Sequence, residues 1–165
     1  MKKSEKKWMS LMKKLSLNLN SFLIILIFIF SYSYSSEQDI ATGEATIIDG
    51  DTIIIKGEKI RFAGIDTPER NKIGHIFSKK KLQQKLSNEI VSCIREPNLD
   101  PWGRTVAECF IGNESISSYM VKNGYACDYV KYSKKKYAKE QEYAKSKKLG
   151  IWNMNFDPKW EKKCG

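Results

Sequence analysis

The chain has one histidine, His75, and none of its four cysteines forms a CxxC pair. Zinc sites in proteins are built from clusters of Cys and His side chains. The scarcity of these ligands argues against a zinc protein, and we interpret His75 as a loop residue. The sequence also has no internal repeat and no low-complexity domain. Its 165 residues therefore predict one domain of ordinary size.

The chain also lacks an apolar run long enough to cross a bilayer, which requires about 20 residues. Residues 22–30 (FLIILIFIF) form a short apolar run that six lysines precede and several serines follow. This order is typical of a signal peptide, here with cleavage after Ser35. We therefore predict a signal peptide at residues 1–35 and a mature domain at residues 36–165. No cysteine lies beside the apolar run, which argues against a lipoprotein anchor, and an uncleaved membrane anchor is the open alternative.

Basic residues outnumber acidic residues by 29 to 19, and the net charge is +10. Residues 1–35 hold six lysines and one glutamate, which leaves 23 basic and 18 acidic residues, or +5, in the mature domain. This excess modestly favours a polyanionic partner such as a nucleic acid. Many soluble proteins are equally basic, so the charge alone does not identify the partner.

Hydrophobic periodicity predicts a mainly β fold with some α, in the α+β class. β-Branched or alternating runs predict five short strands, at residues 44–48, 52–56, 59–65, 89–95 and 104–111. Three helices are expected at about residues 76–86, 115–123 and 134–148. Residues 37–43 read as a flexible lead-in, and Gly64 suggests a bend or a close backbone approach in the third strand. Five strands with a helix between the third and fourth match the OB-fold, a partly open barrel that often binds nucleic acid.

Five charged residues lie in two clusters and one outlier along these strands. Asp51, Asp66 and Glu69 carry hard oxygen donors of the kind that Ca²⁺ or Mg²⁺ needs. Arg61 and Arg104 carry planar guanidinium groups suited to phosphate. Together they suggest phosphodiester hydrolysis. Taken singly, each cluster has a plainer explanation, because Asp-Gly is a hairpin signal and Asp-Thr before Pro is an ordinary strand exit.

The plainer explanations weaken because the clusters occur together, in this order, on strands that a barrel would bring side by side. The motifs are residues 48–52 (IDGDT), 61–69 (RFAGIDTPE) and 100–104 (DPWGR), with further support from residues 121–126 (VKNGYA) and 150–152 (GIW). With this spacing the sequence resembles the staphylococcal nuclease (thermonuclease) family over about residues 44–152.

The resemblance implies a calcium site. Asp51 and Asp66 match the carboxylates that hold Ca²⁺ in the family, and Thr67 matches the residue that contributes a backbone carbonyl. We expect both carboxylates to face solvent at the mouth of the barrel. Because only two carboxylates hold the cation, we expect water and substrate oxygen atoms to complete its shell and the affinity for Ca²⁺ to be modest.

The resemblance also implies the catalytic residues. Glu69 matches the proposed general base that orients or deprotonates the attacking water. Arg61 and Arg104 match the two arginines that grip the scissile phosphate. Preorganised cationic groups of this kind stabilise the transition state, in which negative charge grows, more than the ground state.

Aromatic side chains are the candidates for substrate contacts. Trp102 stands where Tyr is common in the family, and it keeps a ring on which a base can stack. Tyr129 and Tyr132, after the second predicted helix, are candidates for contacts in the substrate pocket. The segment between Glu69 and Arg104 is shorter than in the type member of the family, which leaves the loop beside the site and the cleavage preference open.

All four cysteines lie in the exported part of the chain, where disulfides can form. Cys93 and Cys109 lie in two β-like runs on either side of a turn, so we expect them to pair with each other. The state of Cys127 and Cys164 stays open.

These features predict an endonuclease of the thermonuclease type, a phosphodiesterase that is exported, depends on Ca²⁺ and hydrolyses DNA and RNA with low sequence specificity. The resemblance implies products with 3′-phosphate ends. We expect a secreted or periplasmic monomer with no stable membrane partner after the leader is removed. Two alternatives remain: a non-catalytic nucleic-acid- or protein-binding module on the same fold, and the same nuclease held at the membrane by its leader.

Removal of the leader is directly testable. Because the apolar run is too short to be a stable span, the mature protein should begin at about Ser36 and be soluble outside the cytoplasm. N-terminal sequencing of the protein from its native host measures this. An intact Met1 on a membrane-bound product would show that residues 22–30 act as an anchor.

Overall fold

The computed structural model describes residues 38–164. The predicted leader, its cleavage after Ser35 and the alternative anchor at residues 22–30 lie outside the described residues. Among residues 38–164, no helix has the length and apolar character needed to cross a membrane.

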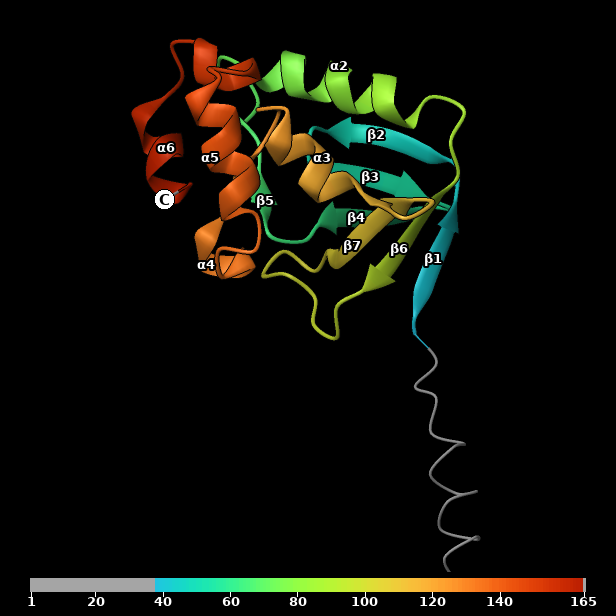
Figure 1. The fold of residues 1–165 in the computed structure, drawn as a ribbon. Coiled ribbons are helices and arrows are strands. Elements are labelled where there is room, and N and C mark those ends of the chain that lie inside the picture. Colours follow the sequence, from blue (N-terminus) through green and yellow to red (C-terminus); the bar gives the residue numbers. More distant parts are fainter. Residues whose placement is uncertain (1–37, 165) are drawn as a thin grey trace, which may run out of the picture. The chain divides into compact units, whose positions relative to one another are not determined.

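The described chain consists of short strands followed and interrupted by short helices (Figure 1). The strands are β1 (Ile40–Gly43), β2 (Ala45–Asp49), β3 (Thr52–Ile55), β4 (Glu58–Phe62), β5 (Ile65–Asp66), β6 (Val91–Arg95), β7 (Thr105–Ile111), β8 (Glu114–Ser115) and β9 (Cys127–Asp128). The helices are α2 (His75–Leu86), α3 (Ile116–Lys122), α4 (Val130–Ser133), α5 (Ala138–Ser146) and α6 (Pro158–Lys163), with a 3₁₀ turn η1 (Gly150–Asn153).

A mixed sheet with the strand order β1-β6-β7-β4-β3-β2 forms the centre of the fold, and β8 pairs with β7. Strands β4 and β7 run parallel, whereas the other pairs in this sheet are antiparallel. The sheet curls, α2 packs against β2, and α3 packs against β7 (Figure 1). The arrangement is a half-barrel with helices, which confirms the predicted α+β fold of the OB type.

The core lies between the concave face of the sheet and helices α2 and α3. Alternation along β3 and β4 sends Ile53, Ile55, Ile60 and Phe62 inward, and each is at most 1% exposed. On the helical side, Leu82, Leu86, Ile116 and Met120 are the buried partners. Burial of such side chains contributes about 1.5–3 kcal/mol each, so the barrel forms a firm platform for the loops at its rim.

The prediction of a flexible lead-in at residues 37–43 is wrong, because Ile40–Gly43 forms β1. This strand pairs antiparallel with β6 and places Ala41, 6% exposed, directly opposite Cys93. Arg95 on β6 holds the start of β1 through an ion pair with Asp39. Without β1, the edge of β6 would present unpaired backbone groups. The pairing joins segments that are distant in the sequence, so a local sequence pattern does not predict it.

The predicted third strand, residues 59–65, is interrupted at Gly64, which has a φ of 71°. A Cβ atom at this position would lie 3.0 Å from the Cβ of Ser133, so both the backbone conformation and the close approach favour glycine. The chain turns here and continues as β5, which pairs with β9 instead of extending β4. The suggested bend is therefore present, and it carries Asp66 away from the main sheet.

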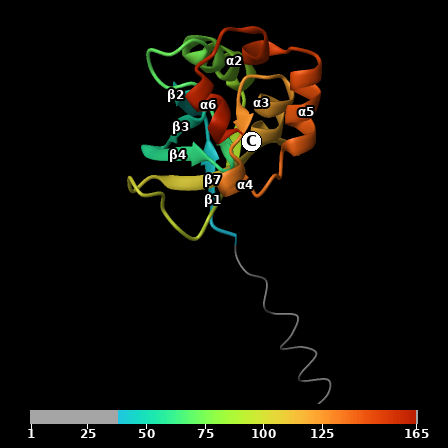
Figure 2. The ribbon, with the colours of Figure 1, turned by 90° about the vertical axis from the view of Figure 1, so that its left-hand side faces the viewer.

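The predicted helix at residues 134–148 is shorter than expected, because α5 begins only at Ala138. Lys134 and Lys135 have φ values of 53° and 67°, which end α4 and keep the chain out of a helix. Beyond the three expected helices, the structure has α4 and the C-terminal helix α6. Helices α4, α5 and α6 gather at one end of the sheet (Figure 1 and Figure 2).

Helix α6 docks through aromatic packing. The ring of Trp160, which is 5% exposed, packs against the rings of Trp152 and Phe156 at centroid distances of 5.5 and 5.6 Å. Asp157 caps the helix by accepting a hydrogen bond from the backbone N–H of Lys159. The last helix is thus part of the folded domain.

Two disulfides tie the fold together. Cys93 and Cys109 lie opposite each other on β6 and β7 and form the pair expected from the sequence. Cys127 on β9 bonds to Cys164, which caps the end of α6. The second bond joins two segments whose pairing the sequence left open.

Both disulfides are expected in the protein purified without reduction. Closing loops of this size stabilises the folded state by about 3–4 kcal/mol each in the chain-entropy model, so reduction should lower the melting temperature clearly. Peptide mapping under non-reducing conditions identifies the pairs. Recovery of Cys93 joined to Cys127 or Cys164, or of free thiols, would contradict this connectivity.

Candidate active site

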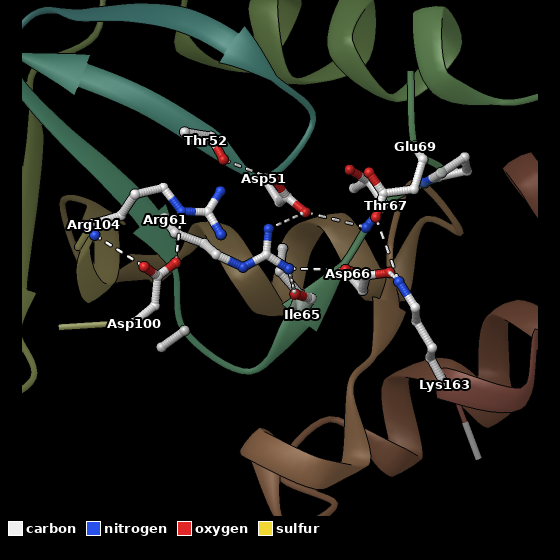
Figure 3. A network of polar contacts seen from close by, with 12 residues as sticks. Asp51, Thr52, Arg61, Ile65, Asp66, Thr67, Glu69, Asp100, Arg104 and Lys163 are labelled. Atoms are coloured by element: carbon white, nitrogen blue, oxygen red, sulfur yellow. Dashed lines mark hydrogen bonds and ion pairs between the residues drawn. The ribbon is translucent and has the colours of Figure 1, made fainter. Parts of the chain in front are cut away.

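Two buried carboxylates form the floor of the candidate site. Asp51 lies in the β2–β3 turn and Asp66 ends β5, and their exposed fractions are 5% and 3%. The expectation that both face solvent is therefore wrong. Their burial follows from Arg61, whose side chain forms ion pairs with both of them (Figure 3).

The β2–β3 turn is held in place by close packing at Gly50. A Cβ atom there would lie 2.8 Å from the Cβ of Ser78 on α2 and 3.0 Å from Cγ2 of Thr67. The turn therefore sits against both the helix and the segment that follows β5. Asp51 secures this contact, because its Oδ2 accepts a hydrogen bond from the Thr67 backbone N–H at 3.3 Å and its Oδ1 accepts one from the Thr52 hydroxyl at 2.9 Å.

Arg61 on β4 bridges the two carboxylates. Its Nη1 lies 2.8 Å from Asp51 Oδ2, and its Nη2 lies 2.8 Å from Asp66 Oδ1 and donates to the Ile65 carbonyl at 3.2 Å. Burial alone would lower the pKa of the guanidinium, but Asp51 and Asp66 outweigh it and raise the pKa. The charge on Arg61 is thus permanent, and the planar group sets the spacing of the two acids.

The surroundings of Asp66 disfavour its charged form. Burial raises its pKa, the neighbouring Asp51 carboxylate raises it further, and Lys163 and Arg61 only partly oppose this. Its Oδ2 atom is buried and has no hydrogen-bond partner in the described part of the chain. A buried, unsatisfied carboxylate oxygen beside a second carboxylate is well suited to a cation.

The donor set fits a hard cation. Asp51 and Asp66 offer carboxylate oxygens and Thr67 offers a backbone carbonyl, all of the oxygen type that Ca²⁺ prefers. Across residues 38–164, no group of three or more Cys, His, Asp and Glu side chains gathers as a metal cluster.

Glu69 and Arg104 lie at the rim and not in the floor. The Glu69 side chain is 70% exposed, just after Pro68 ends the strand segment. Arg104 begins the approach to β7 and is held by Asp100, whose Oδ2 lies 2.6 Å from the arginine Nε. Sequence reading placed Asp100 in a motif but assigned it no role.

Asp100 organises the whole loop that carries Arg104. Its Oδ1 accepts hydrogen bonds from the backbone N–H groups of Trp102 and Arg104, both at 2.9 Å. Burial would raise the pKa of Asp100, but these bonds and the Arg104 side chain lower it. The guanidinium of Arg104 then lies 5.2 Å from the Trp102 ring centroid, in a cation–π contact.

One cleft of about 930 Å³ collects most of the predicted site residues. Its walls include Arg61, Asp66, Glu69, Trp102, Arg104, Tyr129, Tyr132 and Lys163. Asp51 and Thr67 adjoin it through their contacts with Arg61 and with each other. The disulfide between Cys93 and Cys109 lies in the core, away from the cleft.

The aromatic residues line the cleft in two groups. Trp102 is 76% exposed at the tip of its loop. The rings of Tyr129 and Tyr132 meet edge to face, with centroids 4.9 Å apart. Exposed rings beside cationic groups are the usual platform for unstacked bases.

Lys163 is the site residue that sequence reading missed. Its Nζ lies 3.4 Å from Glu69 Oε1 and 3.6 Å from Asp66 Oδ2 (Figure 3). The family motifs end at residue 152, and a lysine near the C-terminus of a lysine-rich chain carries no signal of its own. Only the neighbouring Cys164, which needs a partner, hinted that this segment returns to the domain.

Comparison with known proteins identifies relatives of the chain. A family model described as "Staphylococcal nuclease homologue" matches residues 59–154. The thermonuclease of Staphylococcus intermedius is 34% identical over 125 residues, which is 64% of this chain and 72% of that protein. An uncharacterized endonuclease of Haemophilus influenzae is 36% identical over 115 residues, 66% of this chain and 64% of that protein.

The succinoglycan biosynthesis protein ExoI of Rhizobium meliloti is 31% identical over 121 residues, 67% of this chain and 63% of that protein. The chain thus spans slightly less than two thirds of the length of the Haemophilus and Rhizobium relatives.

The bridge made by Arg61 predicts a large effect on stability. Arg61→Met removes the ion pair with buried Asp51 and leaves buried Asp66 with only its 3.6 Å contact to Lys163 among the described residues. It should lower the free energy of unfolding by about 3 kcal/mol near neutral pH. Urea unfolding measures the loss. Lys136→Met, which removes a 56% exposed partner of Glu108, is the control and should cost less than about 1 kcal/mol. Equal, small losses in both variants would show that Arg61 does not stabilise the floor.

Proposed function

Because this chain belongs to the staphylococcal nuclease family, we propose that it is a calcium-dependent nuclease that hydrolyses phosphodiester bonds in DNA and RNA. One observation carries the proposal. Buried Asp66 lines the same cleft as the exposed Glu69 and Arg104, and Arg61, which also lines it, bridges Asp66 to buried Asp51. This combination suits a phosphate group, an attacking water and a cation. All six residues matched to the family motifs are present: Asp51, Arg61, Asp66, Thr67, Glu69 and Arg104.

Asp51, Asp66 and the Thr67 carbonyl are the residues that would hold Ca²⁺, since their oxygen atoms fit it and Asp66 Oδ2 has no hydrogen-bond partner among residues 38–164. When bound, the cation would supply positive charge that offsets the negative charge growing on the phosphate in the transition state. The protein's own contribution is to hold the two acids in position. Arg61 does this through its two ion pairs.

Arg104 binds the scissile phosphate from the rim of the cleft. Its Nε is already engaged by Asp100, so the loop orients the rest of the guanidinium group before a substrate arrives. Such preorganisation lowers the reorganisation needed when charge grows on the phosphate. Arg61 adds a second permanent positive charge below it.

Glu69 takes the proton of the attacking water or orients that water. Its exposure leaves room for a water molecule beside the carboxylate, within the hydrogen-bond reach that a general base requires. The water oxygen bonds to phosphorus and the bond from phosphorus to the 5′ oxygen breaks. The 5′ oxygen takes a proton from solvent and leaves as a hydroxyl, and the phosphate stays on the 3′ oxygen, which yields 3′-phosphate ends.

Low sequence specificity follows from the means of binding. Trp102, Tyr129 and Tyr132 offer rings to any base, and the arginines recognise the backbone. Stacking and phosphate contacts carry little sequence information, so DNA and RNA are both substrates. The runner-up, a non-catalytic binding module on the same fold, would have no need to keep Glu69 beside paired Asp51 and Asp66.

We place the mature enzyme outside the cytoplasm, as a secreted or periplasmic monomer. Two disulfides support this, because such bonds persist in oxidising compartments. Extracellular Ca²⁺ would also suffice for a site with only two carboxylates.

Degradation of single-stranded DNA and of RNA by the purified protein tests the proposal. Activity should appear with Ca²⁺ and vanish with EDTA. Asp66→Ala should lower the rate by about 10²-fold or more, because a fixed electrostatic contribution to the transition state is lost. Asp39→Ala, which changes an Asp that is 77% exposed and does not line the cleft, is the matched control and should keep full activity.

Folding of each variant is checked by its thermal melting. Undiminished cleavage in EDTA, or full activity of folded Asp66→Ala, would contradict the calcium-site assignment. Absence of cleavage by the wild-type protein with Ca²⁺ would favour the binding module.

A further inference from the structure

A second cationic side chain, in addition to Arg61, faces the candidate metal site. Lys163 on α6 directs its ammonium group at the two acids that no other side chain pairs fully, Asp66 and Glu69 (Figure 3). Asp66 Oδ2, at 3.6 Å, is the same oxygen atom that has no hydrogen bond in the described residues. The lysine therefore stands in front of the atom best placed to receive a metal ion.

The position of Lys163 is built into the fold by its sequence neighbour. Cys164 is bonded to Cys127, and Cys127 lies directly opposite Asp66 in the β5–β9 pair. The disulfide thus joins the residue after Lys163 to the residue across from Asp66. The disulfide is one constraint and the pairing of Cys127 with Asp66 is the other. Together they hold the backbone of Lys163 close to Asp66.

Three further contacts hold the helix that carries the lysine. Trp160 is buried against Trp152 and Phe156. The Gln141 side chain donates a hydrogen bond to the Cys164 carbonyl at 2.6 Å. At the other end of α6, Lys72 forms an ion pair of 3.0 Å with Asp157. The lysine is therefore presented by an anchored helix and not by a loose tail.

The charges in the floor of the cleft make this placement consequential. Asp51, Asp66 and Glu69 are negative, and Arg61 and Lys163 are positive, so the five groups leave one net negative charge. A divalent cation would turn this into one net positive charge, and a phosphodiester, with its single negative charge, would restore neutrality. Without Lys163, the same acids would attract the cation more strongly in the absence of substrate.

We propose that Lys163 is a tethered cation of the metal site, which competes with Ca²⁺ for Asp66 and Glu69 and so keeps the metal affinity of the substrate-free protein low. This inference rests on the proposed function, since it assumes that Asp51 and Asp66 hold a divalent cation. A nucleic-acid phosphate offsets the extra charge, so bound substrate strengthens the retention of the metal. Lys163 thus couples the binding of Ca²⁺ at Asp51 and Asp66 to the binding of the nucleic-acid substrate.

Calorimetric titration of the substrate-free protein with Ca²⁺ alone tests the proposal. Lys163→Met keeps the length and apolar stem of the side chain but removes its charge. It should bind Ca²⁺ about tenfold more tightly than the wild type, the scale set by a nearby like charge in a partly screened site. Lys163→Arg, which keeps the charge, should stay within about twofold of the wild type on the same grounds.

Lys162→Met is the matched control, because it makes the same substitution at the neighbouring exposed position of the same helix. It should leave the Ca²⁺ affinity unchanged. An equal gain in both Met variants would mean that only net charge matters and would overturn the proposal. Unchanged or weaker Ca²⁺ binding by Lys163→Met would also overturn it.

The anchoring of the lysine is tested by removing its disulfide. Cys127→Ala with Cys164→Ala frees the end of α6, and Ca²⁺ should then bind more tightly, towards the value of Lys163→Met. Adding Lys163→Met to this background should bring little further gain, because the two changes act through the same ammonium group. Fully additive gains would contradict the tether.

Failure of the inference and failure of the proposed function give different results. If the wild type binds Ca²⁺ and Lys163→Met binds it equally, the metal site stands and the role of Lys163 falls. If neither protein binds Ca²⁺ and the wild type does not degrade DNA or RNA with Ca²⁺, both proposals are wrong. Thermal melting of each variant, in which loss of this partly exposed ion pair should have little effect, separates a purely structural role from the proposed one.

Discussion

The bridge from Arg61 to Asp51 and Asp66 is the constraint on which the site depends. Two carboxylates that are 5% and 3% exposed repel each other and lose hydration, and burial together with Asp51 raises the pKa of Asp66. The guanidinium, fixed on the central strand β4, offsets much of this cost through two ion pairs. The packing at Gly50 and the turn at Gly64 bring the two acids to that one arginine.

Around this rigid floor, the rim of the cleft is built differently. Glu69 and Trp102 are largely exposed, and Arg104 is oriented by hydrogen bonds to Asp100 instead of by burial. Side chains that must contact water or a nucleobase need to be exposed. Charged side chains that fix one another's position interact more strongly when they are buried. Lys163 belongs to neither class, because an exposed side chain is presented by a firmly anchored helix.

Local signals accounted for much of the fold. The Asp-Gly turn, the alternation of Ile53, Ile55 and Ile60, and the glycine in the third strand each act within a few residues, and the strands and the bend follow from them. The flexible lead-in was wrong because the edge of β6, a distant segment, is what orders Ile40–Gly43. The predicted third helix was too long because Lys134 and Lys135 adopt left-handed backbone conformations. Nothing in the local sequence indicates this conformation, since lysine rarely adopts it.

The sequence alone predicted the family motifs, the α+β barrel and the approach of Asp66, Glu69 and Arg104 to Arg61 in one cleft, since spacing along paired strands limits which side chains meet. The tertiary structure decided how these groups are arranged. Burial of Asp51 and Asp66 depends on Arg61 lying across them, and the pairing of Cys127 with Cys164 depends on where α6 docks. Lys163 reaches Asp66 only because that docking closes a separation of nearly a hundred residues, and no local pattern encodes the energy of such a contact.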